Sequence, residues 1–260
     1  MIFPIKFVSW KEVSNLSWLL ARKIRDSGWI CDVIVAIGRG GFIVSRLLCD
    51  LLGVEKSLAL PIKWYELEKK RGETYLADLI RVFAKAHEGG SSPDEGIAEV
   101  VSKLKVGVSI EQSVNLNGQR ALLVEEIVAT GMHFKLAKEI VRKDWKAGEI
   151  RTATLVWKAP PETMPDYYVI RPGKFVWFQF PWSRLRDYVQ LLRVMLLEES
   201  RREKKLLWPK DMIQEKFKLW YGAEPEPKYF EEATRILEAD GVIKQTEMDK
   251  ILVKLSVKGD

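Results

Sequence analysis

The stretch Ala121-Leu-Leu-Val-Glu-Glu-Ile-Val-Ala-Thr-Gly-Met-His-Phe134 decides how the chain folds. Its first four residues, Ala121 to Val124, are apolar and predict a short buried strand. Glu125 and Glu126 follow at the end of this strand, and Thr130-Gly131 is a small-residue turn before a helical pattern over 134–145. Backbone N–H groups of such a turn, with the positive end of a helix, can hold a phosphate. The two carboxylates can bind sugar hydroxyls or a metal ion, so the segment predicts a site for a sugar phosphate.

A second unit of strand, turn and helix precedes this stretch. Residues 32–37 predict a buried strand, Gly38-Arg39-Gly40-Gly41 a glycine-rich turn, and residues 42–52 a helix that ends at Gly53. Strands that alternate with helices are typical of a parallel α/β sheet. Because the turns after parallel strands meet at one edge of the sheet, we expect the two glycine turns to bind a ligand with two separated phosphate groups.

Other segments predict the remaining elements. Ser9-Trp-Lys-Glu12 has capping-box spacing and opens a helix to about residue 26, and residues 184–205 predict a long amphipathic helix. Asn117-Gly118 predicts a hairpin turn between strands over 106–114 and 120–124. Residues 66–105 hold two helical stretches around a breaker-rich segment and are interpreted as a loop insertion. Further strands are expected over 57–65, 150–157, 166–170 and 174–180.

Composition favours a soluble chain with a packed core. It has 260 residues, of which 47% are hydrophobic and 30% charged, and its net charge is +6. That charge suits phosphate compounds or nucleic acid, and it equally suits the Lys/Glu-rich surface of a thermophile protein. No apolar run reaches the roughly 20 residues of a membrane span, and the N-terminus lacks the cleavage region of a signal peptide, so we expect no membrane contact and a cytoplasmic location. Cys31 and Cys49 are expected to be buried thiols, and with two histidines a zinc site is not expected.

Three segments resemble the type I phosphoribosyltransferases, and most closely the xanthine-guanine/hypoxanthine branch with its small archaeal members. Residues 33–42 resemble the pyrophosphate loop, and residues 122–131 resemble the phosphoribosyl pyrophosphate (PRPP) motif. Trp157-Lys-Ala-Pro160, residues 165–170 and Trp177-Phe-Gln-Phe-Pro-Trp182 resemble the purine-binding hood, here placed at 157–182. The resemblance implies a parallel sheet flanked by helices with a small β hood. It also implies a homodimeric, Mg²⁺-using salvage enzyme that converts a purine base and PRPP to purine mononucleotide and pyrophosphate.

The resemblance also implies roles for individual residues. Arg39 and the turn backbone would hold pyrophosphate, with a strained or cis peptide before Arg39. Glu125 and Glu126 would accept the ribose hydroxyls and, with Arg39, form the catalytic set, while Mg²⁺ would be held indirectly through ribose and pyrophosphate. Trp177 would stack on the purine, the Phe178 backbone would contact its edge, and Lys158 would donate to a 6-oxo group. The expected phosphate-binding residues are Gly38, Arg39, Gly40, Gly41, Glu125, Glu126, Ala129, Thr130, Gly131, Met132 and His133. A mobile loop that excludes water is implied around residues 63–65 and in the insertion.

Three positions depart from the family pattern. Glu126 is a longer acid than the usual Asp, Ala129 replaces a further acid, and His133 replaces a threonine. The change at Ala129 leaves the base open. Ala129 replaces the acid that handles the proton at purine N7 in 6-oxopurine enzymes, and adenine enzymes commonly read Ala-Thr-Gly here. Lys158 and Trp177 instead point to a 6-oxopurine, although Lys158 can also be a solvated strand-end lysine and Trp177 a core aromatic. His133 replaces a threonine that contacts phosphate, and it is either a cationic phosphate ligand or a surface residue.

A composition shift after Trp208-Pro209 places a domain boundary near residue 206, so the transferase domain is expected over 1–205 and a small α+β domain over 206–260. Helices over 211–221 and 229–239 and a hairpin from Gly241 resemble a winged-helix unit. DNA binding needs a basic face, but residues 201–260 hold thirteen Lys/Arg and twelve Asp/Glu, so a packing or protein-binding role is favoured over DNA. The alternative function is a PRPP-sensing transcriptional regulator with a degenerate transferase domain.

Overall fold

The computed structural model describes residues 1–66, 73–108, 114–246 and 249–255. The chain forms two compact units. The sheet unit comprises residues 8–65 and 104–175, and the helical unit comprises residues 1–7, 66–103 and 176–260. The boundaries between the units all lie before residue 176. Helix α6 (Arg184–Arg202) packs against both α3 (Tyr75–Gly89), which precedes residue 206, and α8 (Pro227–Ala239), which follows it. A separate appended domain over 206–260 stays a prediction.

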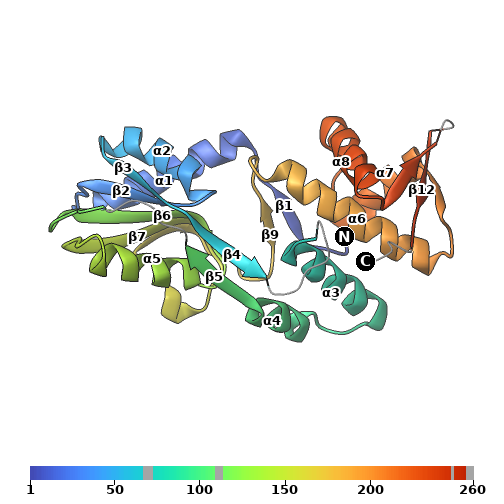
Figure 1. Ribbon diagram of the computed structural model, residues 1–260, viewed down its shortest axis with the longest axis horizontal. Helices are drawn as coiled ribbons and strands as arrows, with labels where there is room; N and C mark the ends of the chain where they lie inside the picture. The colour runs from blue at the N-terminus through green and yellow to red at the C-terminus, as the bar shows by residue number, and fades with distance from the viewer. Residues whose placement is uncertain (67–72, 109–113, 247–248, 256–260) are drawn as a thin grey trace. The chain divides into compact units, whose positions relative to one another are not determined.

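A five-stranded parallel sheet lies at the centre of the sheet unit (Figure 1). Its order is β3-β2-β6-β7-β8. The strands are β2 (Val33–Ile37), β3 (Ser57–Leu60), β6 (Arg120–Val128), β7 (Glu149–Trp157) and β8 (Tyr167–Ile170). Every residue of β2 is buried, as expected for a strand covered on both faces. The predicted α/β fold with a parallel sheet is therefore confirmed.

Helices cover both faces of this sheet (Figure 1). On one face lie α1 (Trp10–Asp26) and α2 (Gly41–Leu52), which contact each other, and on the other lies α5 (Met132–Lys143). The predicted capping box opens α1, with the Ser9 hydroxyl accepting the Glu12 N–H at 3.2 Å. The apolar side of α5 joins one core with β2 and β6, so packing against the sheet, more than local propensity, holds these helices in place.

The order of the strands creates a topological switch point between β2 and β6. These strands pair in parallel register from Val33↔Ala121 to Ala36↔Val124. From β2 the chain crosses through α2 to β3 on one side, whereas from β6 it crosses through α5 to β7 on the other. Ligands of such sheets bind outside the carboxyl ends of the strands at this point, and both glycine turns begin there.

Two predicted strand arrangements are wrong. The strand expected over 57–65 divides at Pro61, which has no N–H for a sheet ladder: β3 pairs with β2, whereas β4 (Ile62–Glu66) pairs with β5 (Leu104–Val108) in a separate sheet. The turn at Asn117-Gly118 forms, with φ of 32° and 80°, but it does not join a hairpin. Both sides of β6 are already paired, with β2 and β7, and residues 109–113 of the expected partner strand lie outside the described residues.

Helix α6 is the centre of the helical unit. It was expected to be amphipathic, but every residue from Asp187 to Leu197 is buried, because α3, α7 (Lys210–Tyr221) and α8 all pack against it. The two helices expected within 66–105 are present as α3 and α4 (Asp94–Ser102). Near the other end of α6, Glu199 accepts the Trp220 indole N–H at 2.7 Å and lies 2.8 Å from Lys216 Nζ, which satisfies its buried charge.

Two small sheets complete the helical unit. The first pairs β1 (Ile5–Phe7) in parallel with β9 (Trp177–Gln179). The second is antiparallel with the order β10-β12-β11, formed by β10 (Leu207–Pro209), β11 (Ile243–Gln245) and β12 (Lys250–Val253). The β11–β12 pairing confirms the hairpin predicted after Gly241.

Cys31 and Cys49 are free thiols, and burial raises the pKa of Cys31 to about 11. Among the residues that the structure describes, no helix is long and apolar enough to cross a membrane.

Gly41 tests the contact between α2 and the sheet. A Cβ at this position would lie 2.4 Å from the carbonyl oxygen of Val124 in β6, and a strand backbone cannot give way cheaply. We expect Gly41→Ala to lower the free energy of unfolding by about 1–3 kcal/mol, measured by urea denaturation.

The matched control is Gly173→Ala, because no atom lies within 4 Å of the added Cβ and the backbone is not left-handed. Its effect should stay within about 0.5 kcal/mol. Equal losses in the two variants would contradict the proposed backbone contact.

Candidate functional site

The first glycine turn, residues 38–41, lies directly against the end of β6. The peptide between Gly38 and Arg39 is cis, as the family resemblance implies. A Cβ on Gly40 would lie 1.7 Å from Oε1 of Glu126, so a side chain there would displace this carboxylate. The Arg39 side chain is exposed at the same turn. The turn therefore brings backbone N–H groups, a cation and an acid to one edge of the sheet.

The two acids lie within β6 and diverge from one another. The strand was expected to end at Val124, but it runs to Val128, and Glu125 still pairs with Thr154 of β7. Successive strand residues face opposite sides of a sheet. Glu125, 7% exposed, meets α5, whereas the half-buried Glu126 meets the Gly40 turn that precedes α2. Although adjacent in sequence, the carboxylates face different partners.

The second glycine turn leads from β6 into α5. Gly131 has a φ of +81°, a conformation that favours glycine, and a Cβ there would lie 2.6 Å from Thr163 in the short 3₁₀ helix η1 (Pro161–Thr163). The Thr130 hydroxyl accepts the Met132 N–H at 3.2 Å. Helix α5 begins at Met132, two residues earlier than expected, so the N–H groups of its first turn lie close to the end of β6.

The buried contact of His133 with Glu125 was not predicted from the sequence. It is 7% exposed in the first turn of α5, and its Nδ1 contacts the Glu125 carboxylate. The surface position considered for His133 is therefore wrong, while a phosphate-binding role stays a prediction. A negative charge near a helix N-terminus is also favourable. The two residues are eight positions apart, and only the strand–turn–helix connection brings them together.

Lys158 follows β7 at the same edge of the sheet. Its N–H donates to the Val128 carbonyl at 2.8 Å, next to Ala129. Its Nζ lies 4.7 Å from the centre of the Phe175 ring, within the range of a cation–π contact. Burial lowers the pKa of the Lys158 ammonium to about 8. Lys158 is half-buried, and its role in base recognition stays a prediction.

Trp177 and Phe178 belong to β9 in the helical unit. The Trp177 indole N–H donates to Asp187 Oδ2 at 3.1 Å, and Phe178 is buried. The expected hood is thus divided: residues 157–175 belong to the sheet unit and residues 176–182 to the helical unit. A common base-binding site of Lys158 with Trp177 and Phe178 stays a prediction.

Asp187 was also missed, because a single acid in a helical pattern carries no motif. It is 7% exposed in the first turn of α6. Burial raises the pKa of its carboxyl from the ordinary 3.8 to about 6, despite hydrogen bonds from Trp177 and Ser183 that favour the charged form. A buried carboxylate that is only partly compensated costs stability.

A parallel sheet flanked by helices, with glycine turns on two adjacent strands, is the architecture of a type I phosphoribosyltransferase. The family model described as the phosphoribosyl transferase domain matches residues 9–185, and the chain belongs to this family. It is accordingly a glycosyltransferase that transfers a pentosyl group.

Several solved structures are similar to this chain. A purine phosphoribosyltransferase from Pyrococcus horikoshii Ot3 is 26% identical, with a TM-score of 0.48, over 70% of this chain and 95% of that one. A hypothetical protein from Neisseria gonorrhoeae with bound ppGpp is 20% identical, with a TM-score of 0.47, over 69% and 90%. The xanthine-guanine-hypoxanthine phosphoribosyltransferase of Helicobacter pylori is 15% identical, with a TM-score of 0.46, over 68% and 92%. The family assignment rests on the sequence match.

The raised pKa of Asp187 predicts a pH-dependent stability. Because the folded state binds this proton more tightly than the unfolded chain, Asp187 stabilises the fold most below about pH 4, and the contribution is lost as pH rises through about 6. Asp187→Asn, which keeps an acceptor oxygen, should therefore be more stable relative to the wild type at pH 7.5 than at pH 4. The expected change is on the order of 1–3 kcal/mol in urea denaturation.

Asp50→Asn is the control, because Asp50 forms an exposed ion pair with Arg46. Its difference from the wild type should change little across this pH range. A pH-independent difference for Asp187→Asn would contradict the assigned burial effect.

Proposed function

We propose that the chain is a purine salvage enzyme that transfers the phosphoribosyl group of PRPP to a 6-oxopurine, giving a purine mononucleotide and pyrophosphate. The environment of Lys158 carries this proposal. Lys158 follows β7 beside the PRPP loop, where its backbone N–H donates to the Val128 carbonyl, and its ammonium can donate a hydrogen bond to a base bound there. A 6-oxo group is an acceptor, whereas the 6-amino group of adenine is a donor.

The remaining residues fit the chemistry of PRPP. Displacement at the anomeric carbon builds positive charge on the ribose and negative charge on the departing pyrophosphate. In this proposal the Gly38–Gly41 backbone and Arg39 hold the pyrophosphate, and the first turn of α5 holds the 5′-phosphate. Glu125 and Glu126 accept the ribose hydroxyls. Preorganised donors around the leaving group lower the barrier electrostatically.

Mg²⁺ also fits this edge of the sheet. In proteins this ion commonly takes one or two carboxylates together with substrate phosphates, and the Glu126 carboxylate lies against the Gly40 backbone of the turn proposed to hold pyrophosphate. Among the described ranges no group of three or more His, Cys, Asp or Glu could hold a metal ion. We therefore propose that the ion comes with PRPP and is held through pyrophosphate and ribose, with Glu125 and Glu126 acting through the hydroxyls. When bound, it would neutralise charge on the leaving group.

Ala129 is the residue that favours adenine as the base. It is exposed at the start of the PRPP loop and has no group that can take a proton from purine N7. Incubation with PRPP, Mg²⁺ and adenine, hypoxanthine, guanine or xanthine separately decides between the bases. We expect nucleotide from at least one 6-oxopurine and none from adenine. Turnover of adenine alone would show that Ala129 predicts the base better than Lys158 does. No turnover with any of the four bases would contradict the proposed purine phosphoribosyltransferase activity.

Lys158→Gln should weaken recognition of the 6-oxopurine. A hydrogen bond to a charged group contributes roughly 1.5–3 kcal/mol, so the KM for hypoxanthine should rise about 10- to 100-fold with little change in the KM for PRPP. Because the pKa of Lys158 is about 8, the wild-type advantage over the variant should shrink above pH 8, as the ammonium loses its proton. Steady-state kinetics from pH 7 to 9.5 measure both effects.

Lys158→Arg, which keeps the charge, should recover part of the affinity, and Lys138→Gln on the exposed side of α5 should have no effect. An unchanged KM for hypoxanthine in Lys158→Gln would remove Lys158 from base recognition.

The C-terminal segment favours a second candidate function. The order α6, β10, α7, α8, β11, β12, with β12 between the other two strands, resembles a winged-helix unit and supports a PRPP-sensing transcriptional regulator. Its third helix, α8, carries Glu231 and Glu232 against Lys228 and Arg235, so it offers no basic face. We therefore favour a packing or protein-binding role. Salt-sensitive binding of duplex DNA, together with no turnover, would favour the regulator.

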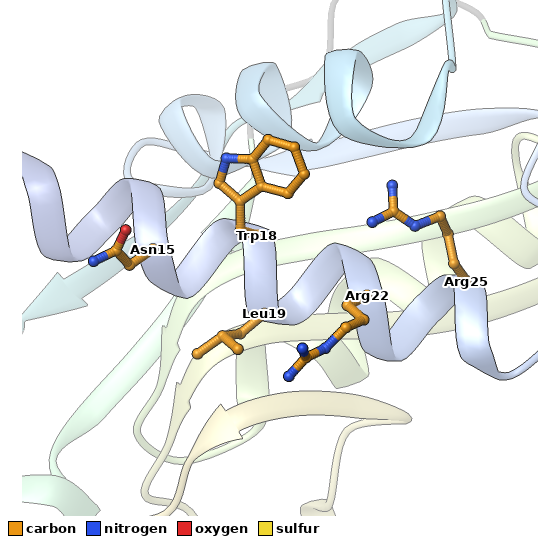
Figure 2. Close-up of a pocket in the computed structure, with 5 residues that line it drawn as sticks. All are labelled: Asn15, Trp18, Leu19, Arg22 and Arg25. Atoms are coloured by element: carbon orange, nitrogen blue, oxygen red, sulfur yellow. The ribbon is translucent and has the colours of Figure 1, made fainter.

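We further propose that two copies pair through the outer face of α1. Trp18 and Leu19 are 55% and 38% exposed there. Together with Asn15, Arg22 and Arg25 they line a hollow on the helix surface (Figure 2). The first turn of α1 is acidic at Glu12 and the last turn is basic. An antiparallel pair of α1 helices would bring these ends together, as an isologous interface requires.

Trp18→Glu should therefore produce monomers, because it places a charge at the centre of this interface. Sedimentation velocity should show a dimer for the wild type and half that mass for the variant. Leu219→Glu is the control, since Leu219 is 52% exposed on α7 of the helical unit and should leave the dimer intact. A monomeric wild type, or a dimeric Trp18→Glu variant, would contradict the pairing.

A further inference from the structure

His133 and Glu125 form a buried pair within the sheet unit, where β6 leads into α5. Both side chains are buried, and Nδ1 of His133 contacts Oε1 of the Glu125 carboxylate. An ionised carboxylate only accepts hydrogen bonds, so Nδ1 carries the hydrogen in this contact. Within the part of the chain that the structure describes, no lysine or arginine pairs with Glu125, and its second oxygen, Oε2, accepts no hydrogen bond.

Regular structure fixes the backbone on both sides of this contact. Glu125 pairs with Thr154 of β7, in a strand that is also paired with β2. His133 lies in the first turn of α5, whose apolar side joins the core with β2 and β6. The Lys135 N–H donates to the Gly131 carbonyl at 3.0 Å, so His133 lies inside a closed helical turn. The contact therefore leaves the Glu125 side chain little freedom to turn.

Stability alone does not account for an acid at position 125. Residues 121–124 of the same strand are apolar and fully buried, and an apolar side chain at 125 would continue that run. Replacing a buried ion pair by apolar side chains is often neutral or stabilising, whereas a buried charge without its partner costs stability. A buried pair next to Glu126, at the switch point of the sheet, therefore indicates a function that needs a charged carboxylate in a fixed position.

We propose that His133 is a positioning residue for PRPP: it holds one oxygen of the Glu125 carboxylate, so that the other oxygen is presented to a ribose hydroxyl. The proposal rests on the proposed function, in which Glu125 accepts the ribose hydroxyls. A glutamate side chain turns about several torsions, and a carboxylate that is already fixed loses less freedom when its ligand binds. His133 then acts on the ribose through Glu125, and the backbone N–H groups of the first turn of α5 hold the 5′-phosphate.

A double-mutant cycle on PRPP binding tests this role. In titration calorimetry with PRPP and Mg²⁺ and without a base, we expect His133→Ala to raise the Kd of PRPP about tenfold. His133→Asn should recover most of this loss, because its side-chain amide can also donate to the carboxylate. In a Glu125→Ala background, His133→Ala should have no further effect.

Two controls limit the effect to the ribose. Inorganic pyrophosphate, which has no ribose, should bind His133→Ala and the wild type with Kd values within about twofold of each other. His87, the other histidine of the chain, is exposed at the end of α3, so His87→Ala should leave the Kd of PRPP unchanged.

Direct contact of His133 with the 5′-phosphate predicts a different pattern. The effects of His133→Ala and Glu125→Ala on the Kd of PRPP would then be independent and would multiply in the double variant. That result, or an unchanged Kd in His133→Ala, would overturn the positioning role.

A second measurement uses the wild type and does not depend on the folding of His133→Ala. Because the chain has two histidines, a ¹H–¹⁵N spectrum of histidine-labelled protein contains two imidazole rings, and His133→Asn assigns them. The Nδ1–H of His133 should exchange slowly with water, faster in Glu125→Ala, and should persist when PRPP is added. Equal exchange rates, or loss of this signal on addition of PRPP, would overturn the proposal.

These measurements separate the inference from the proposed function. If PRPP binds and the cycle holds but no purine reacts, the purine activity fails while the role of His133 stands. If purines react and the two substitutions act independently, the activity stands and the positioning role fails. A wild type that does not bind PRPP would overturn both.

Discussion

The close approach of the Gly38–Gly41 turn to β6 is the constraint on which the sheet unit depends. Gly40 lies against the Glu126 carboxylate and Gly41 against the backbone of Val124. A side chain at position 41 would press on the backbone of β6 and separate α2 from it, whereas one at position 40 would displace the Glu126 carboxylate. Because the two strands are paired directly, this spacing also sets the distance between the two glycine turns, and with it the size of the ligand that can span them.

Buried charged groups in this protein fall into two kinds. In the helical unit, Glu199 is surrounded by Lys216 and the Trp220 indole, and Arg193 of α6 pairs with Asp240, so these groups tie α6 to its neighbours. Lys158 and Asp187 differ, because burial shifts the pKa of each toward its neutral form. Strongly shifted pKa values are common at functional sites, where the surroundings tune a group for its chemistry at some loss of stability. That contrast supports the role proposed for Lys158.

Local pattern was a sound guide where one interaction decides the outcome. The run 32–37 predicts a buried strand and Ser9 with Glu12 predicts a helix start, and β2 and α1 agree closely with both expectations. The sequence pattern gave wrong predictions where contacts with other helices or strands decide the structure. Asn117-Gly118 makes its turn, but the sides of β6 are occupied by β2 and β7. Residues 187–197 of α6 carry polar side chains and are buried nonetheless, because helices pack around them.

The sequence by itself determined the class of the sheet unit and the identity of its two turns. The glycines at 38, 40, 41 and 131 predict the two turns, and the acids at 125 and 126 mark the strand that leads into the second turn. Only the tertiary structure decided what the acids face, that His133 meets Glu125, and that Asp187 holds Trp177. The physical reason is that these contacts join side chains from different elements. Their partners are therefore chosen by strand register, by the face of the sheet and by helix packing, none of which a single stretch of sequence specifies.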